Sequence, residues 1–271
     1  MKKTVLITGT SSGIGKAAVF EFAEKGWNVV ATQRSPDVDR SFDHLENVLL
    51  VKLDVTDTNS ISEAFDRSVK AFGKLDVVVN NAGYGVDGVF EAMSDEVIEQ
   101  QFNTNVFGLM RVTRAAIRHM RAVGGGIIIQ VSSMGGKVTF PLYSIYHSSK
   151  FAVEGFTESL HYELSPFNIR LKLVEPGLTA TEFTGRSRKF VKPDNDAAYD
   201  LYLEKFRVAA EKAMKGAEKP EVIARGIFKA ATDGRDTLRY PVGAPAPMIL
   251  WLRKLLSDRL FFSMVKTTYK V

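Results

Sequence analysis

The sequence predicts an α/β domain built on a doubly wound parallel sheet. Strand-like and helix-like segments alternate along the 271 residues, a glycine cluster at 9–15 joins the first strand to the first helix, and the segment 75–83 is almost continuously apolar. Alternating strands and helices favour parallel strands with right-handed crossovers. Strands that helices cover on both faces are apolar throughout. We therefore expect ligands at the carboxyl ends of the strands.

The individual elements follow from the local pattern of each segment. Short β-rich runs predict the strands, and longer amphipathic runs predict the helices between them. The expected strands are 4–9, 27–33, 47–55, 75–83, 127–133 and 169–177. The expected helices are 11–26, 60–73, 95–120 and 144–164. No linker-like run divides the chain, so we expect one domain over residues 1–271.

The composition limits the classes of function. Hydrophobic residues make up 45% of the chain and charged residues 25%, which is typical of a globular protein with a large core. The chain has no cysteine, which excludes disulfides, thiolate metal sites and cysteine nucleophiles and favours a cytoplasmic location. We expect no metal site. The first apolar run is interrupted too early to be a secretion signal.

The positive charge is concentrated at the C-terminal end. Residues 247–271 contain five basic residues and one acidic residue, a net charge of +4 out of the total of +5. A nearly neutral body does not predict a nucleic-acid partner.

The same segment has Leu252, Leu256, Leu260 and Met264 at helical spacing, so we expect an amphipathic helix over 247–271. The helix either docks on the protein with its lysine stems along apolar surface, the interpretation we favour, or lies on a membrane surface. Its apolar run is too interrupted to span a bilayer.

The glycine cluster TGTSSGIG predicts a phosphate-binding turn. Gly9, Gly13 and Gly15 follow the first strand and open the first helix. Glycine permits a tight turn, a close backbone approach to a diphosphate and close packing of helix on strand. The helix amino terminus then offers free N–H groups to the phosphates. A purely structural turn is the alternative interpretation.

The end of the second strand predicts the choice of cofactor. NAD enzymes usually place a carboxylate there against the ribose hydroxyls, but this chain has Gln33 followed by Arg34. A guanidinium can bind a 2′-phosphate, which a carboxylate would repel. NADP(H) is therefore favoured, with a solvated loop arginine as the alternative. Asp54 ends the third strand and either accepts a hydrogen bond from the adenine amino group or caps the next helix.

Tyr146 and Lys150 lie four residues apart in YHSSK, on one face of the expected helix. A free tyrosine has a pKa of about 10, and a neighbouring ammonium favours its phenolate, so the pair suits acid–base chemistry. Ser133 ends a strand thirteen residues earlier, where its hydroxyl can donate to a substrate oxygen that gains negative charge. Ser132 is expected to point away from the site.

Three asparagines stand at informative places. Asn105 lies inside an expected helix, where asparagine is a mediocre former, so we expect a packing or polar role. Asn80 and Asn81 close the fourth strand, and we expect them mainly to fix the loops through backbone hydrogen bonds.

These motifs together resemble those of the short-chain dehydrogenase/reductase family over about the first 185 residues. In order, they are TGTSSGIG at 8–15, NNAG at 80–83, NxxG at 105–108, Ser133, YHSSK at 146–150 and PG at 176–177. The resemblance implies a Rossmann fold with an NADP(H)-preferring carbonyl reductase or hydroxysteroid dehydrogenase activity.

The resemblance also implies roles for individual residues. Tyr146 would be the general acid–base, and Ser133 would orient the carbonyl. Lys150 would bind the ribose and lower the tyrosine pKa, and Asn105 would hold a proton-relay water. NADP enzymes of the family often have a basic residue where this chain has Ser12, so the preference for NADP(H) rests on Arg34.

The expected cofactor-binding residues form a larger set drawn from the loops at the strand ends. They are Gly9, Ser11, Ser12, Gly13, Ile14, Gly15, Arg34, Asp54, Val55, Asn81, Ala82, Gly83, Tyr146, Lys150, Pro176, Gly177, Thr179 and Thr181. Similar proteins usually pair through their two long helices, so we expect a homodimer or homotetramer.

The expected substrate is a hydrophobic ketone or aldehyde, or the corresponding secondary alcohol. Residues 178–215 break the alternation and carry several aromatics, including Phe183, and in similar enzymes this stretch is a lid over the substrate. Met134 and Tyr143 lie between the catalytic serine and tyrosine, and with Ser133 and Tyr146 they are expected to contact the substrate. A steroid, a retinoid or an aryl ketone would suit such a pocket.

The main rival function is a catalytically silent regulator that senses dinucleotides. Such a protein would be expected to lose Ser133, Tyr146 or Lys150. Because all three are present, the sequence favours an enzyme.

Overall fold

The computed structural model describes residues 2–181, 188–193 and 197–270 and has a seven-stranded parallel sheet at its centre. The strand order is β3-β2-β1-β4-β6-β7-β9, and every neighbouring pair is parallel. The strands are β1 (Thr4–Thr8), β2 (Asn28–Gln33), β3 (Val48–Lys52), β4 (Val77–Asn80), β6 (Gly126–Val131), β7 (Ile169–Pro176) and β9 (Arg239–Val242). The predicted fold class, a Rossmann-like doubly wound sheet, is confirmed.

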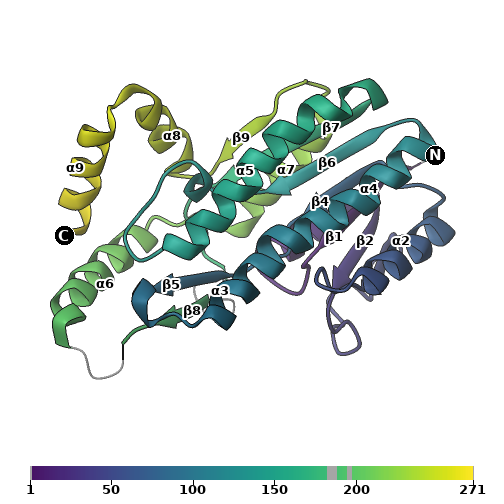
Figure 1. Ribbon diagram of the computed structural model, residues 1–271. Helices are drawn as coiled ribbons and strands as arrows, with labels where there is room; N and C mark the ends of the chain where they lie inside the picture. Colours follow the sequence, from purple (N-terminus) through teal and green to yellow (C-terminus); the bar gives the residue numbers. More distant parts are fainter. Residues whose placement is uncertain (1, 182–187, 194–196, 271) are drawn as a thin grey trace.

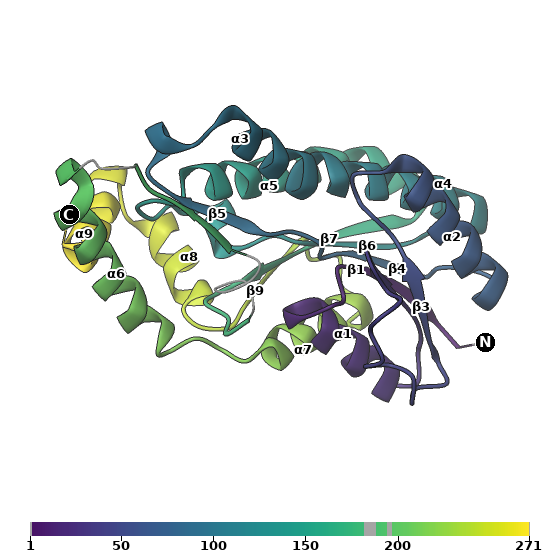
Figure 2. The ribbon, with the colours of Figure 1, turned by 90° about the horizontal axis from the view of Figure 1, so that it is seen from below.

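Helices cover both faces of this sheet (Figures 1 and 2). On one face lie α1 (Gly13–Glu24) and α7 (Pro220–Thr232), and on the other lie α2 (Thr58–Phe72), α4 (Leu109–Val123) and α5 (Ser144–Leu164). The remaining helices are α3 (Asp95–Phe102), α6 (Asp200–Met214), α8 (Ala246–Leu255) and α9 (Asp258–Tyr269). A second, two-stranded sheet pairs β5 (Gly85–Gly88) with β8 (Arg188–Val191).

The core follows the two-residue period of the strands. Val5 and Ile7 of β1 pack with α1 and α7, whereas Leu6 between them packs with α2, α4 and α5. Successive side chains of a strand point to opposite faces. Because both faces are covered, all five residues of β1 are buried, as the continuous apolar runs predict.

The strand order creates a crevice at the carboxyl edge of the sheet. The chain winds from β1 through β2 to β3 on one side and then returns to place β4 on the other side of β1. The loops that leave β1 and β4 therefore diverge to opposite faces, and ligands of such sheets bind at this point.

The structure corrects two expected helices. The predicted helix 95–120 is divided into α3, a π-helical segment over Asn103–Gly108 and α4. The predicted single helix over 247–271 is two helices, α8 and α9, because Leu256 is extended and the chain turns before Asp258.

The structure also contains elements that the sequence patterns did not predict. These are β5, β8, β9 and α7. Among the described residues, no helix combines the length and apolarity that crossing a bilayer requires.

Candidate active site

The loop between β1 and α1 approaches the neighbouring backbone so closely that it excludes side chains. A Cβ on Gly9 would lie 2.8 Å from the Cα of Ala82, and a Cβ on Gly15 would lie 2.2 Å from the carbonyl oxygen of Gly9. Gly9 and Gly13 also have positive φ values, 70° and 56°, which favour glycine. The helix α1 that follows has no side-chain cap and no acidic residue in its first turn, so its amino terminus is available to an anion.

The loop after β4 is held against this turn by Asn81. Its amide Nδ2 donates to the carbonyls of Thr8 at 2.9 Å and Gly9 at 3.0 Å. The buried Asn80 amide donates to Thr113 and Gln130, both at 2.9 Å. Asn81 therefore binds backbone groups as expected, whereas Asn80 binds side chains of α4 and β6 instead. Asn81 also lines the central cavity described below.

Two charged residues that the sequence analysis did not predict, Lys16 and Asp39, lie near the end of β2. Gln33 is buried, and its Nε2 donates to Asp39 at 2.7 Å. Although burial opposes it, hydrogen bonds from Ser41 and Gln33 lower the pKa of Asp39, so this carboxylate is ionised at neutral pH. Lys16 donates to Ser41 at 2.6 Å. Arg34 is exposed, and among the described residues no acidic group forms an ion pair with it.

Sequence reasoning missed Lys16 and Asp39, which line the cavity beside Arg34. Lys16 directly follows the glycine cluster, so its position alone could have indicated it. Asp39 lies six residues beyond β2 in a loop without a clear pattern, and nothing in the sequence indicated that it folds back onto Gln33.

Asp54 is not the cap of the next helix. Its Oδ1 accepts hydrogen bonds from the backbone N–H and the hydroxyl of Thr56, at 2.8 and 2.7 Å. The cap of α2 is Asp57, which accepts from the N–H of Asn59. The capping alternative is therefore wrong, and Asp54 lines the cavity.

Ser133, Tyr146 and Lys150 meet at the carboxyl edge of β6. Ser133 follows β6, Tyr146 lies in the first turn of α5, and Lys150 lies one turn later. The Tyr146 hydroxyl is hydrogen-bonded to Ser133. Lys150 Nζ donates to the carbonyl of Val131 at 2.9 Å and lies 5.9 Å from the centre of the Tyr146 ring.

The pKa values of Tyr146 and Lys150 differ from the expectation that the lysine lowers the tyrosine pKa. Burial raises the pKa of Tyr146 to about 12, which the hydrogen bond from Ser133 opposes. Burial lowers the pKa of Lys150 to about 8, which the charge of Glu154 opposes. The expected lowering of the tyrosine pKa is thus not produced by the protein groups. At neutral pH the tyrosine is protonated, and it can donate a proton.

Asn105 is buried in the π-helical segment and binds the backbone of Tyr84 twice. Its Oδ1 accepts from the Tyr84 N–H at 3.1 Å, and its Nδ2 donates to the Tyr84 carbonyl at 2.8 Å. The Nδ2 atom also lies 3.4 Å from the Ser149 hydroxyl. π-Helical turns often occur at functional sites. The side chain therefore fixes the loop after β4, and a role in holding water stays a prediction.

One cavity of about 1470 Å³ unites these parts. Every expected cofactor-binding residue lines it, as do Ser133, Met134 and Tyr143 of the expected substrate contacts. Of the expected site residues that the structure describes, Asn105 alone lies outside this lining. Phe183 lies outside the described residues.

The cavity has an apolar side that the C-terminal helices complete. Met134 packs in a cluster with Leu250 of α8 and Phe261 of α9. Four side chains that sequence reasoning did not place here also line the cavity, namely Met248, Leu252, Met264 and Val265.

A row of aromatic rings extends this side from the catalytic tyrosine. Tyr143 lies 6.4 Å from Tyr146 and 5.8 Å from Phe206 of α6, and Phe206 stacks on Tyr269 of α9 at 5.6 Å between ring centres. The cavity thus has a polar side that suits an anionic ligand and an apolar side that suits a hydrophobic ligand.

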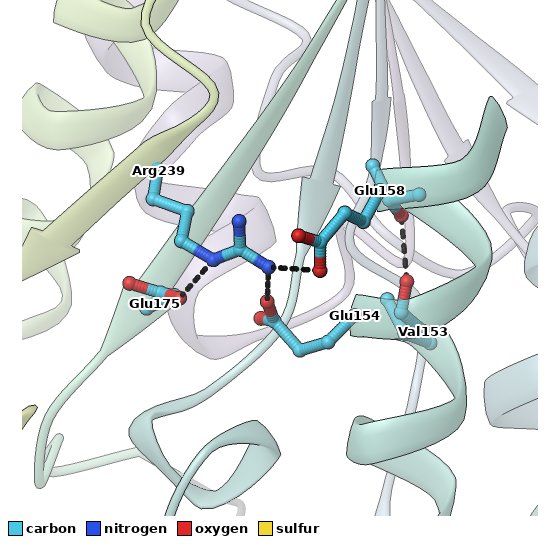
Figure 3. Close-up of polar contacts among 6 residues, drawn as sticks. Val153, Glu154, Glu158, Glu175 and Arg239 are labelled. Atoms are coloured by element: carbon cyan, nitrogen blue, oxygen red, sulfur yellow. Dashed lines mark hydrogen bonds and ion pairs between the residues drawn. The ribbon is translucent and has the colours of Figure 1, made fainter. Parts of the chain in front are cut away.

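An ionic cluster joins Arg239 of β9 to glutamates of α5 and β7 (Figure 3). Arg239 of β9 binds Glu154 and Glu158 of α5, each at 3.1 Å, and lies 3.4 Å from Glu175 of β7. The side chains of Glu154 and Glu175 are 4% and 1% exposed. Burial, followed by the charge of Glu154, raises the pKa of Glu175 to about 7. One guanidinium therefore holds two buried carboxylates, one of which is a single turn from Lys150.

Ser132 lies near Glu154 of this cluster and also lines the central cavity. Burial raises the pKa of the Glu154 carboxyl, and the nearby Ser132 hydroxyl opposes this shift. The expectation that Ser132 points away from the site stays a prediction.

Comparison with known proteins gives consistent matches. The family model described as short chain dehydrogenase matches residues 3–192. The chain is 37% identical over 275 residues to the uncharacterized oxidoreductase YusZ of Bacillus subtilis, covering 98% of both chains. It is 33% identical over 250 residues to 3-ketodihydrosphingosine reductase of Bacteroides thetaiotaomicron, covering 92% of this chain and 90% of that protein.

Solved structures of similar proteins share the fold. A short-chain dehydrogenase from Streptomyces avermitilis superimposes with a TM-score of 0.82 at 29% identity, covering 100% and 98% of the two chains. ElxO with NADP bound gives 0.74 at 30% identity, covering 89% and 98%. A 3-ketoacyl-(acyl-carrier-protein) reductase from Brucella melitensis, complexed with NADH, gives 0.77 at 25% identity, covering 90% and 98%.

The ionic cluster gives a stability prediction for Arg239→Met. Removing one partner leaves buried carboxylates without their counter-charge, which costs about 3–5 kcal/mol. Protonation relieves this cost, and a raised carboxyl pKa means that stability is lost as pH rises. We expect the loss of unfolding free energy in urea to be larger at ~pH 8 than at ~pH 5.5. Arg239→Lys, which keeps the charge, should lose less. An equal loss for Arg239→Met at both pH values would contradict this account.

Proposed function

We propose that this chain, which belongs to the short-chain dehydrogenase family, transfers a hydride between NADP(H) and a hydrophobic ketone or aldehyde, or the corresponding secondary alcohol. One observation carries the proposal. A single cavity contains the glycine turn, the hydrogen-bonded Ser133 and Tyr146, and an apolar side built from Met134 and the C-terminal helices.

The residues present fit a dinucleotide phosphate. The glycine turn provides a cradle that a Cβ would fill, and the uncapped amino terminus of α1 would hold the diphosphate. Arg34 and Lys16 would hold a 2′-phosphate, and their two positive charges would outweigh the repulsion from the ionised Asp39, which Gln33 and Ser41 bind in the same loop. When bound, the cofactor supplies or accepts the hydride at its nicotinamide ring.

The remaining expected contacts are divided between the two ends of the cofactor. Asp54 and Val55 would meet the adenine, and Asn81, Ala82 and Gly83 would line the middle. Residues 176–181, which include Thr179 and Thr181, would meet the nicotinamide end. ElxO binds NADP and the Brucella reductase is complexed with NADH, so the preference for NADP(H) is supported chiefly by Arg34.

Tyr146 and Ser133 would perform the proton chemistry. The Ser133 hydroxyl would orient the substrate oxygen, and Tyr146 would donate its hydroxyl proton as that oxygen gains negative charge. Because burial keeps Tyr146 protonated at neutral pH, the tyrosine can act as the proton donor in carbonyl reduction. Lys150 would bind the ribose, and its ammonium would stabilise the phenolate left after the transfer.

The substrate class follows from the apolar side of the cavity. This side is lined by Met134, Tyr143 and residues of α8 and α9. None of these described lining residues is charged. One relative is named a 3-ketodihydrosphingosine reductase, after a ketone with a long hydrocarbon chain. We therefore propose an apolar carbonyl compound, with steroids, retinoids, aryl ketones and long-chain ketones as the candidates. Of the range 178–215 that we predict as a lid, helix α6 would cover the substrate, because Ala210, Ala213 and Met214 line the cavity.

The alternative, a dinucleotide sensor without catalysis, has no specific observation in its favour. The assembly into a homodimer or homotetramer and the cytoplasmic location stay predictions.

The experiment that tests the function is a substrate panel. Apolar ketones and aldehydes would be offered with NADPH and with NADH, and consumption of the reduced cofactor would be followed. Reduction of apolar carbonyls with NADPH supports the proposal. Binding of NADPH without turnover of any carbonyl would favour the sensor.

The cofactor preference predicts the effect of Arg34→Ala. Loss of the charged hydrogen bonds should weaken NADPH binding by about 1.5–3 kcal/mol and leave NADH binding nearly unchanged. Titration with each cofactor measures both values. Arg40→Ala is the matched control, since Arg40 is an exposed arginine of the same loop that does not line the cavity. Equal binding of NADH and NADPH by the unaltered protein would refute the preference.

The proton donor predicts the effect of Tyr146→Phe. The variant keeps the ring but lacks the transferable proton, so turnover should fall by about 10²–10⁴-fold while NADPH binding survives. Lys150→Met should reduce both, because one ammonium serves the tyrosine and the ribose. Tyr162→Phe, at an exposed tyrosine of α5, is the control. Turnover by Tyr146→Phe close to that of the control would remove the proposed acid.

A further inference from the structure

Helix α8 has an exposed apolar stripe on the side turned away from the protein. Met248, Trp251 and Leu255 are 60%, 59% and 62% exposed. At 3.6 residues per turn these three positions fall within an arc of about 60°. Ala246 and Leu250, which are buried, lie on the opposite side of the helix. The helix is thus apolar on two faces, and a surface helix normally has only one such face.

Exposed basic residues lie on the same C-terminal segment as this stripe. Lys254 lies on α8 one turn from Trp251, Arg259 and Lys266 lie on α9, and Lys270 directly follows α9. All four side chains are exposed. Arg253 is neutralised by Asp258 at 2.6 Å. Among the described residues, no acidic group forms an ion pair with the other four cations. The segment of α8 and α9 therefore combines exposed apolar side chains, including a tryptophan, with uncompensated positive charge.

The stripe adjoins the lining of the central cavity. Met248 belongs both to the stripe and to the cavity lining, and Leu252, one position beyond Trp251, lines the cavity as well. Helices α6, α8 and α9 gather at the same end of the molecule in both views (Figures 1 and 2). A surface that covered the stripe would therefore lie next to the apolar side of the cavity.

We propose that this face of α8 and α9 docks on an anionic lipid bilayer. Charge decides between the bilayer and a second copy of the chain. A symmetric contact between two such faces would bring together two segments that each carry a net charge of +4, and like charges oppose association. An anionic surface attracts the same cations. Tryptophan and amphipathic helices with basic flanks are typical of membrane interfaces.

Docking would let an apolar substrate pass from the bilayer into the cavity without crossing water. Only this delivery rests on the proposed function, because the stripe and the cations are independent of the chemistry.

The test is co-sedimentation of the full chain with phosphatidylcholine vesicles, with and without phosphatidylserine. No substrate or cofactor is present, so the result does not depend on the enzyme being active. We expect binding to the phosphatidylserine vesicles that weakens as salt is added. We also expect Trp251→Ser and the double variant Lys254→Glu/Arg259→Glu to lose roughly tenfold or more in affinity.

Two variants at distant surfaces are the matched controls. Tyr162→Ser removes an exposed aromatic from α5, and Arg225→Glu/Lys229→Glu makes the same change of charge on exposed positions of α7. Both should bind vesicles as the unaltered chain does. Absence of binding, or equal losses in the test and control variants, would overturn the proposal. It would also be overturned if Trp251→Ser abolished self-association while vesicle binding was absent, since the face would then join two copies of the chain.

Discussion

The close contact between the loops that leave β1 and β4 is the constraint on which the site depends. Asn81 binds the carbonyls of Thr8 and Gly9, and Gly9 and Gly15 have no room for a side chain. This contact fixes the start of α1 at the strand edge and keeps its N–H groups free. Because β4 and β6 are neighbours in the sheet, it also sets the distance from the phosphate turn to Ser133 and Tyr146. Larger side chains at either glycine would separate the two halves of the cavity.

The charges around the catalytic group are arranged in layers. Tyr146 is kept protonated by burial, Lys150 lies beneath it, and Glu154 supports the lysine charge from one turn further along α5. Arg239 then holds Glu154 and ties it to β7 and β9. A buried carboxylate pair needs such a cation to be tolerated. The C-terminal strand of the sheet, far from the motifs in sequence, thus supports the electrostatics of the site.

Local sequence patterns were sufficient to predict the elements whose structure depends mainly on their own residues. Helix α5 has the bounds 144–164 that its pattern predicts, and the glycine turn, Ser133, Tyr146 and Lys150 all reach one cavity. The sequence patterns did not predict segments whose structure depends on contacts with other parts of the chain. The π-helical segment forms where Asn105 binds Tyr84, and the loop after β2 folds back so that Asp39 meets Gln33. Helix α7 could have been found, because Pro220 opens it and apolar residues follow at helical spacing.

The central claim is that cofactor and carbonyl react within one cavity, and transfer of an isotope tests it directly. NADPH carrying deuterium on the transferable position of its nicotinamide would be incubated with the protein and an apolar ketone, and the alcohol would be analysed by mass spectrometry. The account predicts one deuterium on the carbinol carbon of the product and none from solvent at that position. Tight binding of NADPH, with no deuterium in any alcohol product across the ketones tried, would contradict it.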